Sequence, residues 1–243
     1  MIRHHHQQVA GAQVACALAA LLAAALLAAA LVTPASAVLP TADQPVRNLY
    51  LIRHGEYVHD ETCDEAVGCE LDALGREQAR LVAARLDAMP VVFTSLQTSP
   101  LTRARGTATI IAAQMPELTP LVQNDIRECT PSTRRQDVME GLKPGEAVEC
   151  EVQLAAAALR LLVPATGAAD AHDIVVCHGN VIRWLVCRAL GVDPQAWLGM
   201  SIANCSLTII QVKADGSCKL ISFADSGHIP WSQTTYPGVT WNP

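Results

Sequence analysis

The sequence predicts an α/β domain with a mostly parallel central sheet and helices on both faces of it. Short β-branched or apolar runs alternate with stretches of helical apolar spacing along most of the chain, an order typical of α/β folds. Two of the apolar runs end in the same dipeptide, at His54-Gly55 and at His178-Gly179. The chain shows neither an internal repeat nor a sign of a second domain, so we expect one domain over residues 38–243.

The predicted strands are short and bounded by turn residues. Two of them immediately precede the His-Gly pairs, and two others flank Asp215-Gly216, a dipeptide typical of hairpin turns. The predicted strands are 48–52, 91–94, 118–121 (the weakest), 174–177, 207–212 and 219–223.

Four segments have the apolar spacing or the terminal signals of helices. Asp72 is a candidate N-cap for the first helix, and Gly191 ends the last. Pro100 occupies an early position of the second, where its missing N–H costs little. The predicted helices are 74–86, 98–114, 147–162 and 180–190, with a loop at 56–70 and a lid or surface loop at 124–145.

Residues 1–37 have the pattern of a secretory signal peptide. Arg3 and three histidines precede an apolar run over 14–32, and Ala35-Ser36-Ala37 is the small-x-small pattern that signal peptidases cut. An uncleaved membrane anchor is the alternative, because 14–32 is nearly long enough to cross a bilayer core of about 30 Å. These interpretations predict a periplasmic or secreted protein, or one anchored to the inner membrane.

The charge of the chain argues against nucleic acid or an anionic membrane surface as a partner. Asp and Glu number 23 against 17 Lys and Arg, the net charge is −6, and the basic residues form no cluster. An anionic substrate would therefore be held by a few focused arginines. The sequence has no Cys-x-x-Cys and no His/Cys ligand spacing, so we predict neither a metal site nor a cofactor.

The chain has nine cysteines, of which Cys16 lies in the predicted signal peptide. Spacing alone does not assign partners to the rest, and an exported chain permits disulfides. We favour the pair Cys63–Cys69, which shares one loop-like stretch, and the pair Cys129–Cys150, which flanks another irregular region. The two cysteines in a predicted strand and helix, Cys177 and Cys187, are expected to be buried free thiols.

Four separate segments carry side chains suited to phosphate chemistry. Arg53 and His54 follow the first strand at its carboxyl end, the edge where α/β proteins bind ligands, and His178 follows the central strand. If these strands are neighbours, the two imidazoles face one pocket. Arg103 lies early in a helix, where an anion gains from both the guanidinium and the helix N-terminus, and Glu128 lies at the mouth of the irregular loop.

These segments resemble the motifs of the histidine phosphatase superfamily, which has the phosphoglycerate-mutase-like fold, a three-layer sandwich. The matching motifs are Arg53-His54-Gly55-Glu56, the helix start at 99–108 and His178-Gly179-Asn180, in the family's order, and the resemblance spans about 49–230. Within the superfamily, the segments 178–190, 203–206 and 225–230 look most like the mitochondrial mutase-like protein serine/threonine phosphatases.

The resemblance implies a metal-independent phosphomonoesterase in which His54 becomes phosphohistidine. It assigns the holding of the phosphoryl charge to Arg53, Arg103 and His178, and proton transfer to Glu128, which rests on a looser match. The residues expected to bind phosphate are Arg53, Arg103, His178 and Gly179. The substrate would be protein phosphoserine or phosphothreonine, or a small phosphate ester.

Some residues depart from the family pattern. Many members carry a Thr or Ser after the first motif and, two residues later, an Asn that contacts phosphate, where this chain has Tyr57-Val58-His59. Asp72-Ala73-Leu74-Gly75 replaces a Thr-Pro-x-Gly turn, so the pocket rim differs. The alternative function is a catalytically silent phosphate-binding or scaffolding protein at the membrane, with self-association. The intact set of Arg53, His54, Arg103 and His178 favours the enzyme, because a binding module has no need of a nucleophilic imidazole.

Overall fold

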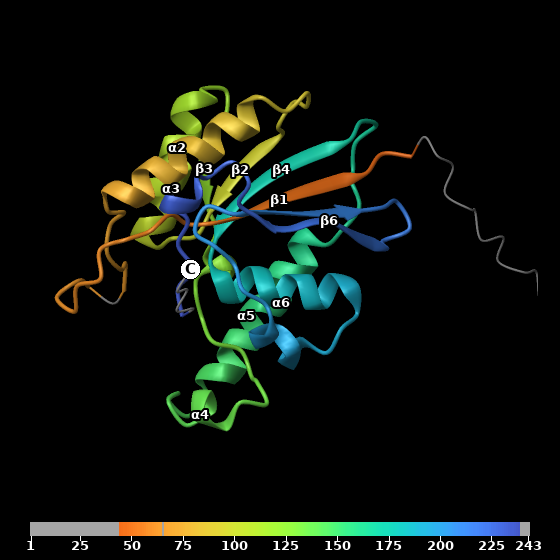
Figure 1. The fold of residues 1–243 in the computed structure, drawn as a ribbon. Helices are drawn as coiled ribbons and strands as arrows, with labels where there is room; N and C mark the ends of the chain where they lie inside the picture. Colours follow the sequence, from red (N-terminus) through yellow and green to blue (C-terminus); the bar gives the residue numbers. More distant parts are fainter. Residues whose placement is uncertain (1–43, 65, 239–243) are drawn as a thin grey trace, which may run out of the picture. The chain divides into compact units, whose positions relative to one another are not determined.

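A mixed sheet in the order β3-β2-β4-β1-β5-β6 forms the centre of the computed structural model, which describes residues 44–64 and 66–238 (Figure 1). β1, β2, β3 and β4 run parallel, and β5 and β6 form an antiparallel hairpin beside β1. The strands are β1 Arg47–Arg53, β2 Ser95–Thr98, β3 Pro120–Val122, β4 Ala171–Cys177, β5 Leu207–Val212 and β6 Cys218–Asp225.

Helices cover both faces of the sheet, which confirms the predicted fold class (Figure 1). α2 (Ala73–Asp87) and α3 (Thr102–Gln114) pack on one face, against Tyr50 and Ile52 of β1. α5 (Glu146–Leu161) and α6 (Gly179–Leu190) pack on the other, against Leu49 and Leu51. Alternate residues of β1 therefore enter two separate cores, as the two-residue period of a strand requires.

The predicted helix ends are confirmed where a side chain or a glycine defines them. The Asp72 carboxylate accepts a hydrogen bond from the Gly75 amide at 2.7 Å and caps α2. Gly191 has a φ of 64° and ends α6 in the left-handed conformation that glycine adopts without strain.

The second strand lies four residues later than predicted. The β-branched run 91–94 is not a strand, and Val92 in it is 82% exposed. Regular pairing begins at Ser95, which lies opposite Asp173 of β4. The residues that form this strand are therefore those that lie beside β4, and not those with the highest β propensity.

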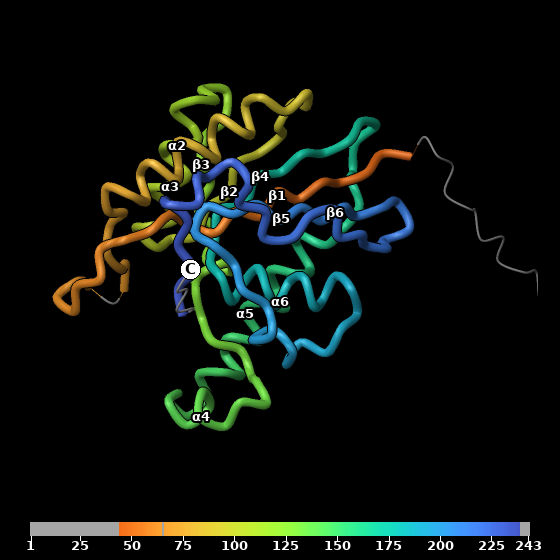
Figure 2. The backbone as a smooth tube through the Cα atoms, viewed as in Figure 1, coloured from red at the N-terminus to blue at the C-terminus, as the bar shows by residue number. Residues whose placement is uncertain are grey.

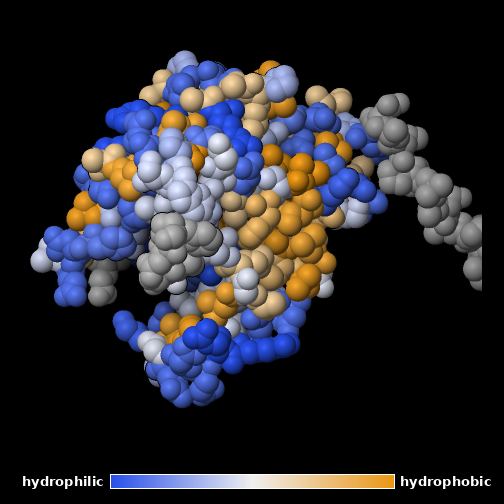
Figure 3. Space-filling view, in the orientation of Figure 1, coloured by the Kyte–Doolittle hydropathy of each residue, from blue (hydrophilic) through white to orange (hydrophobic). Residues whose placement is uncertain are grey.

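The segment predicted to be a lid or surface loop is largely irregular. It contains η1 (Asn124–Ile126) and the one-turn helix α4 (Gln136–Met139). Figure 2 shows this segment in green and the 56–70 loop in orange, both extending away from the sheet. Hydrophilic side chains cover the projecting α4 region (Figure 3), and Arg135 and Asp137 form an ion pair there. Two further short helices are η2 (Pro194–Gly199) and η3 (Trp231–Gln233).

Both favoured disulfides, Cys63–Cys69 and Cys129–Cys150, are confirmed. Cys177 and Cys187 are buried free thiols, also as predicted. The predicted signal peptide or anchor, residues 1–37, lies outside the described residues. Within the described ranges, no helix combines the length and the apolar character needed to span a bilayer.

Candidate active site

The carboxyl ends of β1 and β4 bring two histidines together. Arg53 lies opposite Cys177 in the parallel register, so the residues that follow, His54 and His178, emerge side by side. The His54 amide donates to the Cys177 carbonyl at 3.0 Å, and the two imidazole centroids are 5.0 Å apart. Both side chains are buried. The expectation that these strands are neighbours is confirmed.

The His54 ring is held in one tautomer with a free lone pair on Nε2. Nδ1 lies 2.7 Å from the Gly55 carbonyl oxygen, and because a carbonyl only accepts, Nδ1 carries the proton. Nε2 then accepts from Arg103 Nε at 3.0 Å. Burial, followed by Arg103 and Arg53, holds the pKa of His54 well below 6.5. The imidazole is therefore neutral near neutral pH, as a nitrogen nucleophile must be.

The His178 ring is contacted by Ser99, the residue directly after β2. Nε2 of His178 lies 2.7 Å from the Ser99 hydroxyl oxygen, which also accepts from the Leu101 amide. The hydroxyl proton is thus available for Nε2, which favours the tautomer with its proton on Nδ1. Burial, His54 and three arginines hold the pKa of His178 well below 6.5, so this ring is neutral near neutral pH as well.

Two arginines flank the imidazole pair. Arg53 donates from Nη1 to the Ile202 carbonyl at 2.6 Å, and Arg103, in the first turn of α3, lies over the Tyr57 ring with 4.8 Å between Cζ and the centroid. Burial lowers the pKa of both guanidinium groups, and Glu128 opposes the shift. Each remains a permanent cation near neutral pH.

Glu128 reaches the same place from the segment after η1. Its Oε2 lies 3.7 Å from Nδ1 of His178, and its side chain is 26% exposed. Burial raises the pKa of this carboxyl above 4.5, while Arg53 and Arg103 pull it back. A carboxyl group with a raised pKa beside an anion site is suited to carrying a proton.

Three buried polar atoms at this place have no hydrogen-bond partner among the described residues: Arg53 Nε, Glu128 Oε1 and His178 Nδ1. They come from three different segments of the chain and converge around the imidazole pair. Buried polar groups are otherwise almost always paired, so such a convergence is typical of a site that binds a polar ligand.

Gly179, the remaining predicted phosphate-binding residue, is the first residue of α6. A Cβ atom on it would lie 3.2 Å from a terminal nitrogen of Arg183 and 3.6 Å from Cζ of Arg53. Glycine therefore leaves room for the guanidinium of Arg53 beside the start of α6. The structure thus brings all six predicted site residues together at the carboxyl edge of the sheet.

Sequence reasoning assigned no role to several residues that hold this site in place. The Asn204 side-chain amide donates to the His54 carbonyl at 3.0 Å, and the Cys205 amide donates to the Arg53 carbonyl at 3.0 Å. Cys205 adopts a φ of 52°, a conformation that is strained for a side-chain-bearing residue. No spacing signal identifies these contacts, because they depend on the loop before β5 returning to the end of β1.

The rim residues that depart from the family pattern lie beside His54. The Tyr57 ring meets the His54 ring edge-on, with centroids 5.4 Å apart, and His59 is exposed and pairs with Glu56 at 3.0 Å. No group of three or more His, Cys, Asp or Glu side chains in the described ranges could hold a metal ion.

The sequence matches the family model of the histidine phosphatase superfamily (branch 1) over residues 49–143 and 131–225. "Serine/threonine-protein phosphatase Pgam5, mitochondrial" from Caenorhabditis briggsae is 35% identical over 75% of this chain and 64% of its own length. The human relative, "Serine/threonine-protein phosphatase PGAM5, mitochondrial", is 31% identical over 78% of this chain and 66% of its own length. The chain thus spans about two thirds of the length of these relatives.

Solved structures share the fold. Bacillus stearothermophilus YhfR superposes with a TM-score of 0.61 at 22% identity, covering 76% of this chain and all of the other. Plasmodium falciparum phosphoglycerate mutase has a TM-score of 0.54 at 23% identity, covering 82% of this chain and 99% of the other. The predicted three-layer, mutase-like sandwich is therefore confirmed.

The predicted location is wrong. The relatives at 31–35% identity are mitochondrial by name, which contradicts a periplasmic or secreted protein and one anchored to the inner membrane by an export signal. The physical reason is that receptors recognise amino-terminal targeting segments. The hydrophobicity of such a segment does not by itself specify the compartment to which the protein is sent.

Proposed function

Because the chain belongs to the histidine phosphatase superfamily (branch 1), we propose that it is a phosphomonoesterase acting through a phosphohistidine on His54. One observation carries the proposal: Nε2 of His54 lies in the same buried site as three polar atoms that have no hydrogen-bond partner among the described residues. These atoms are Arg53 Nε, Glu128 Oε1 and His178 Nδ1. A phosphoryl group needs this combination of a nucleophile, donors for its oxygens and a proton carrier for the leaving oxygen.

In the first step, the Nε2 lone pair of His54 forms a bond to phosphorus while the ester P–O bond breaks. Glu128 gives its proton to the departing oxygen, so the alcohol leaves neutral and Glu128 becomes a carboxylate. The hydrogen bond from Nδ1 to the Gly55 carbonyl supports this role, since it keeps the lone pair on Nε2.

In the second step, water attacks the phosphohistidine. The Glu128 carboxylate takes a proton from the water, the P–N bond breaks, and inorganic phosphate leaves with His54 neutral again. Glu128 ends protonated, ready for the next ester, so protons balance over the cycle.

The charge on the phosphoryl oxygens is held by Arg53, Arg103 and His178. Arg103 Nε donates to the nitrogen that attacks, and a bound phosphoryl group would draw this guanidinium onto an equatorial oxygen. Because such donors act in a buried site, losing one is expected to cost about 2.7–4 kcal/mol of transition-state stabilisation.

The proposed substrates are proteins that carry phosphoserine or phosphothreonine. The names of the relatives at 31–35% identity support this class, and small phosphate esters are the alternative. Self-association stays a prediction from the sequence.

The test is hydrolysis of p-nitrophenyl phosphate by the purified protein with a chelator present, together with alkaline quenching of a reaction with the radiolabelled ester, because phosphohistidine survives alkali. Wild type should turn over and carry acid-labile label at His54, and His54→Gln should do neither. His172→Gln is the matched control, because His172 lies at the far end of β4, where its ring meets the Tyr50 hydroxyl at 2.9 Å.

A folded wild-type protein without turnover and without label would contradict the proposal. If that protein still bound inorganic phosphate, it would be the silent phosphate-binding protein that the sequence left as the alternative.

A further inference from the structure

We propose that the disulfide Cys129–Cys150 is a positioning device for Glu128: it holds the segment that carries this carboxyl where a leaving oxygen must be protonated. The inference rests on the proposed function and concerns the same site. Cys129 follows Glu128 directly in the chain, and Cys150 lies in α5.

The segment that carries Glu128 is not held by its backbone. Residues 128–134 belong to neither helix nor strand. No backbone–backbone hydrogen bond joins them to the rest of the described chain. A segment without such bonds keeps its shape only through the contacts of side chains, so these contacts decide where Glu128 lies.

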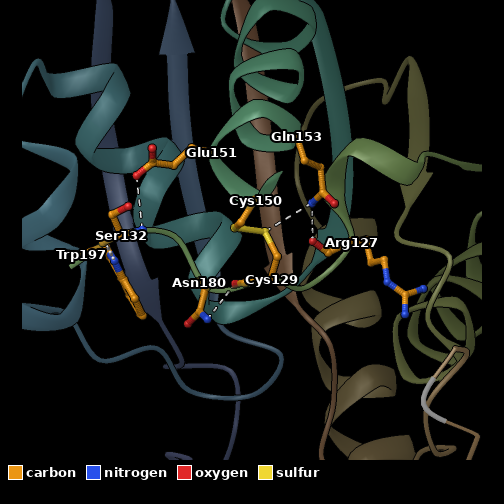
Figure 4. The surroundings of a disulfide bond; sticks show 8 residues. All are labelled: Arg127, Cys129, Ser132, Cys150, Glu151, Gln153, Asn180 and Trp197. Carbon is orange, nitrogen blue, oxygen red and sulfur yellow. Dashed lines mark hydrogen bonds between the residues drawn. A yellow bond between two sulfur atoms is a disulfide. The ribbon is translucent and has the colours of Figure 1, made fainter. Parts of the chain in front are cut away.

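Side-chain contacts anchor both neighbours of Glu128 (Figure 4). On one side, Gln153 of α5 donates to the Arg127 carbonyl at 2.8 Å. On the other, Asn180 of α6 donates to the Cys129 carbonyl at 2.9 Å. The two neighbours of Glu128 are therefore each hydrogen-bonded to a different helix, α5 or α6, and both helices pack against the same face of the sheet.

The same segment is fixed again four residues further on (Figure 4). The Ser132 amide donates to Glu151 Oε1 at 3.3 Å, and the Ser132 carbonyl accepts from Trp197 Nε1 at 3.1 Å. Each of these hydrogen bonds can be exchanged for one to water. The disulfide cannot, so it is the contact that keeps the segment against α5.

The position of a general acid matters at the scale of one ångström. The group must lie within hydrogen-bond reach of the oxygen it protonates, and a misplacement of about 1 Å can cost on the order of 10²-fold in rate. Cys150 is buried on the face of α5 that packs on the sheet, so it gives Cys129 a rigid attachment. The Cα atoms of the two cysteines are 5.5 Å apart.

The experiment separates positioning from a merely structural role by using two leaving groups. p-Nitrophenolate is stable as an anion and needs little protonation, whereas an alkoxide from an alkyl phosphate is strongly basic and needs it. Since kcat/KM covers the steps up to cleavage of the P–O bond, a change in the ratio of the alkyl to the aryl value between wild type and variant reports a change in the protonation of the leaving oxygen.

The full-length variant C129S/C150S is expected to keep kcat/KM for p-nitrophenyl phosphate within a few-fold of wild type and to lose on the order of 10²-fold for an alkyl phosphate. Glu128→Gln should lower the same alkyl-to-aryl ratio, with a loss of roughly 10²–10⁴-fold for the alkyl phosphate. C63S/C69S is the matched control, because it removes the other disulfide, in the loop between β1 and α2, and should leave the ratio unchanged.

If C129S/C150S does not fold, the C63S/C69S protein is reduced in its folded state with dithiothreitol. Cys129 and Cys150 then take up two electrons and two protons to become thiols, and the dithiol becomes its cyclic disulfide. The same fall in the alkyl-to-aryl ratio is expected.

An unchanged ratio in the variant or after reduction, or equal losses on both substrates, would overturn the positioning role while leaving the proposed function standing. A folded wild type that hydrolyses neither substrate would overturn the proposed function and this inference together.

Discussion

The Ser99 hydroxyl lies 2.7 Å from Nε2 of His178 and ties the end of β2 to the end of β4. Neither side chain is exposed. The hydroxyl oxygen accepts the Leu101 amide, which leaves its proton free to point to Nε2 of His178; in that arrangement the proton of the imidazole is on Nδ1, the atom on the Glu128 side. Ser99 thus acts through His178 rather than on the ligand.

Replacing Ser99 with alanine is expected to lower kcat/KM about tenfold and to destabilise the fold by about 1–3 kcal/mol, the cost of leaving a buried nitrogen unpaired. Steady-state kinetics and urea unfolding measure the two effects. Ser217→Ala, which removes an exposed hydroxyl in the β5–β6 turn, is the control. Unchanged kinetics in Ser99→Ala would show that His178 needs no partner to orient it.

The rate with an alkyl phosphate should fall as the pH rises through the Glu128 pKa. Burial raises this pKa above 4.5, so the protonated acid persists to a higher pH than in a free carboxyl, and the rate then falls about tenfold per pH unit. On the acid side, burial and two arginines hold the pKa of His54 well below 6.5, so the nucleophile becomes protonated only at a more acidic pH than a free imidazole does. Activity should therefore extend to acidic pH.

A pH profile of kcat/KM for wild type and Glu128→Gln checks this assignment. The variant should lack the alkaline fall, while titration of the phosphate ester itself is common to both proteins. A fall at the same pH in both would assign it to another group.

Gly75 is expected to tolerate no side chain. A Cβ atom there would lie 1.8 Å from the Glu56 carbonyl oxygen, where the chain leaving His54 crosses the first turn of α2. Gly75→Ala should destabilise the protein by about 3 kcal/mol, the upper part of the range for overpacking, because backbone must move. Gly199→Ala is the control, since a Cβ atom there meets nothing within 4 Å. Urea unfolding of both variants measures the difference, and equal stability would contradict the close approach.

The two disulfides should stabilise the fold to different degrees. In the chain-entropy description, the cross-link with a sequence separation of 21 (Cys129–Cys150) contributes about 3 kcal/mol and the one with a separation of 6 (Cys63–Cys69) about 2 kcal/mol. Urea unfolding of C129S/C150S and C63S/C69S measures each loss. A larger loss for Cys63–Cys69 would mean that denatured-state entropy does not dominate.

Sequence reasoning located the candidate site residues better than the elements around them. Arg53-His54 and His178-Gly179 were recognisable because a nucleophilic or charged side chain directly after a buried strand has few other purposes, and a parallel sheet collects such positions at one edge. The run 91–94 was wrongly predicted to be a strand. Residues with high β propensity favour an extended chain, but a strand also needs a neighbouring strand to pair with, and pairing with β4 begins only at Ser95.

The sequence by itself determined the α/β class through local periodicity, and short motifs selected the six residues that meet at the sheet edge. It favoured the two disulfide pairs only because each lies within or beside one irregular stretch. Only the tertiary structure decided how those residues are held. The Ser99 contact to His178, the Asn204 amide on the His54 carbonyl and the hydrogen bonds from α5 and α6 to the neighbours of Glu128 join residues far apart in the chain. Such contacts leave no periodic pattern and no characteristic spacing in the sequence, because they form when elements that are distant in the chain pack together.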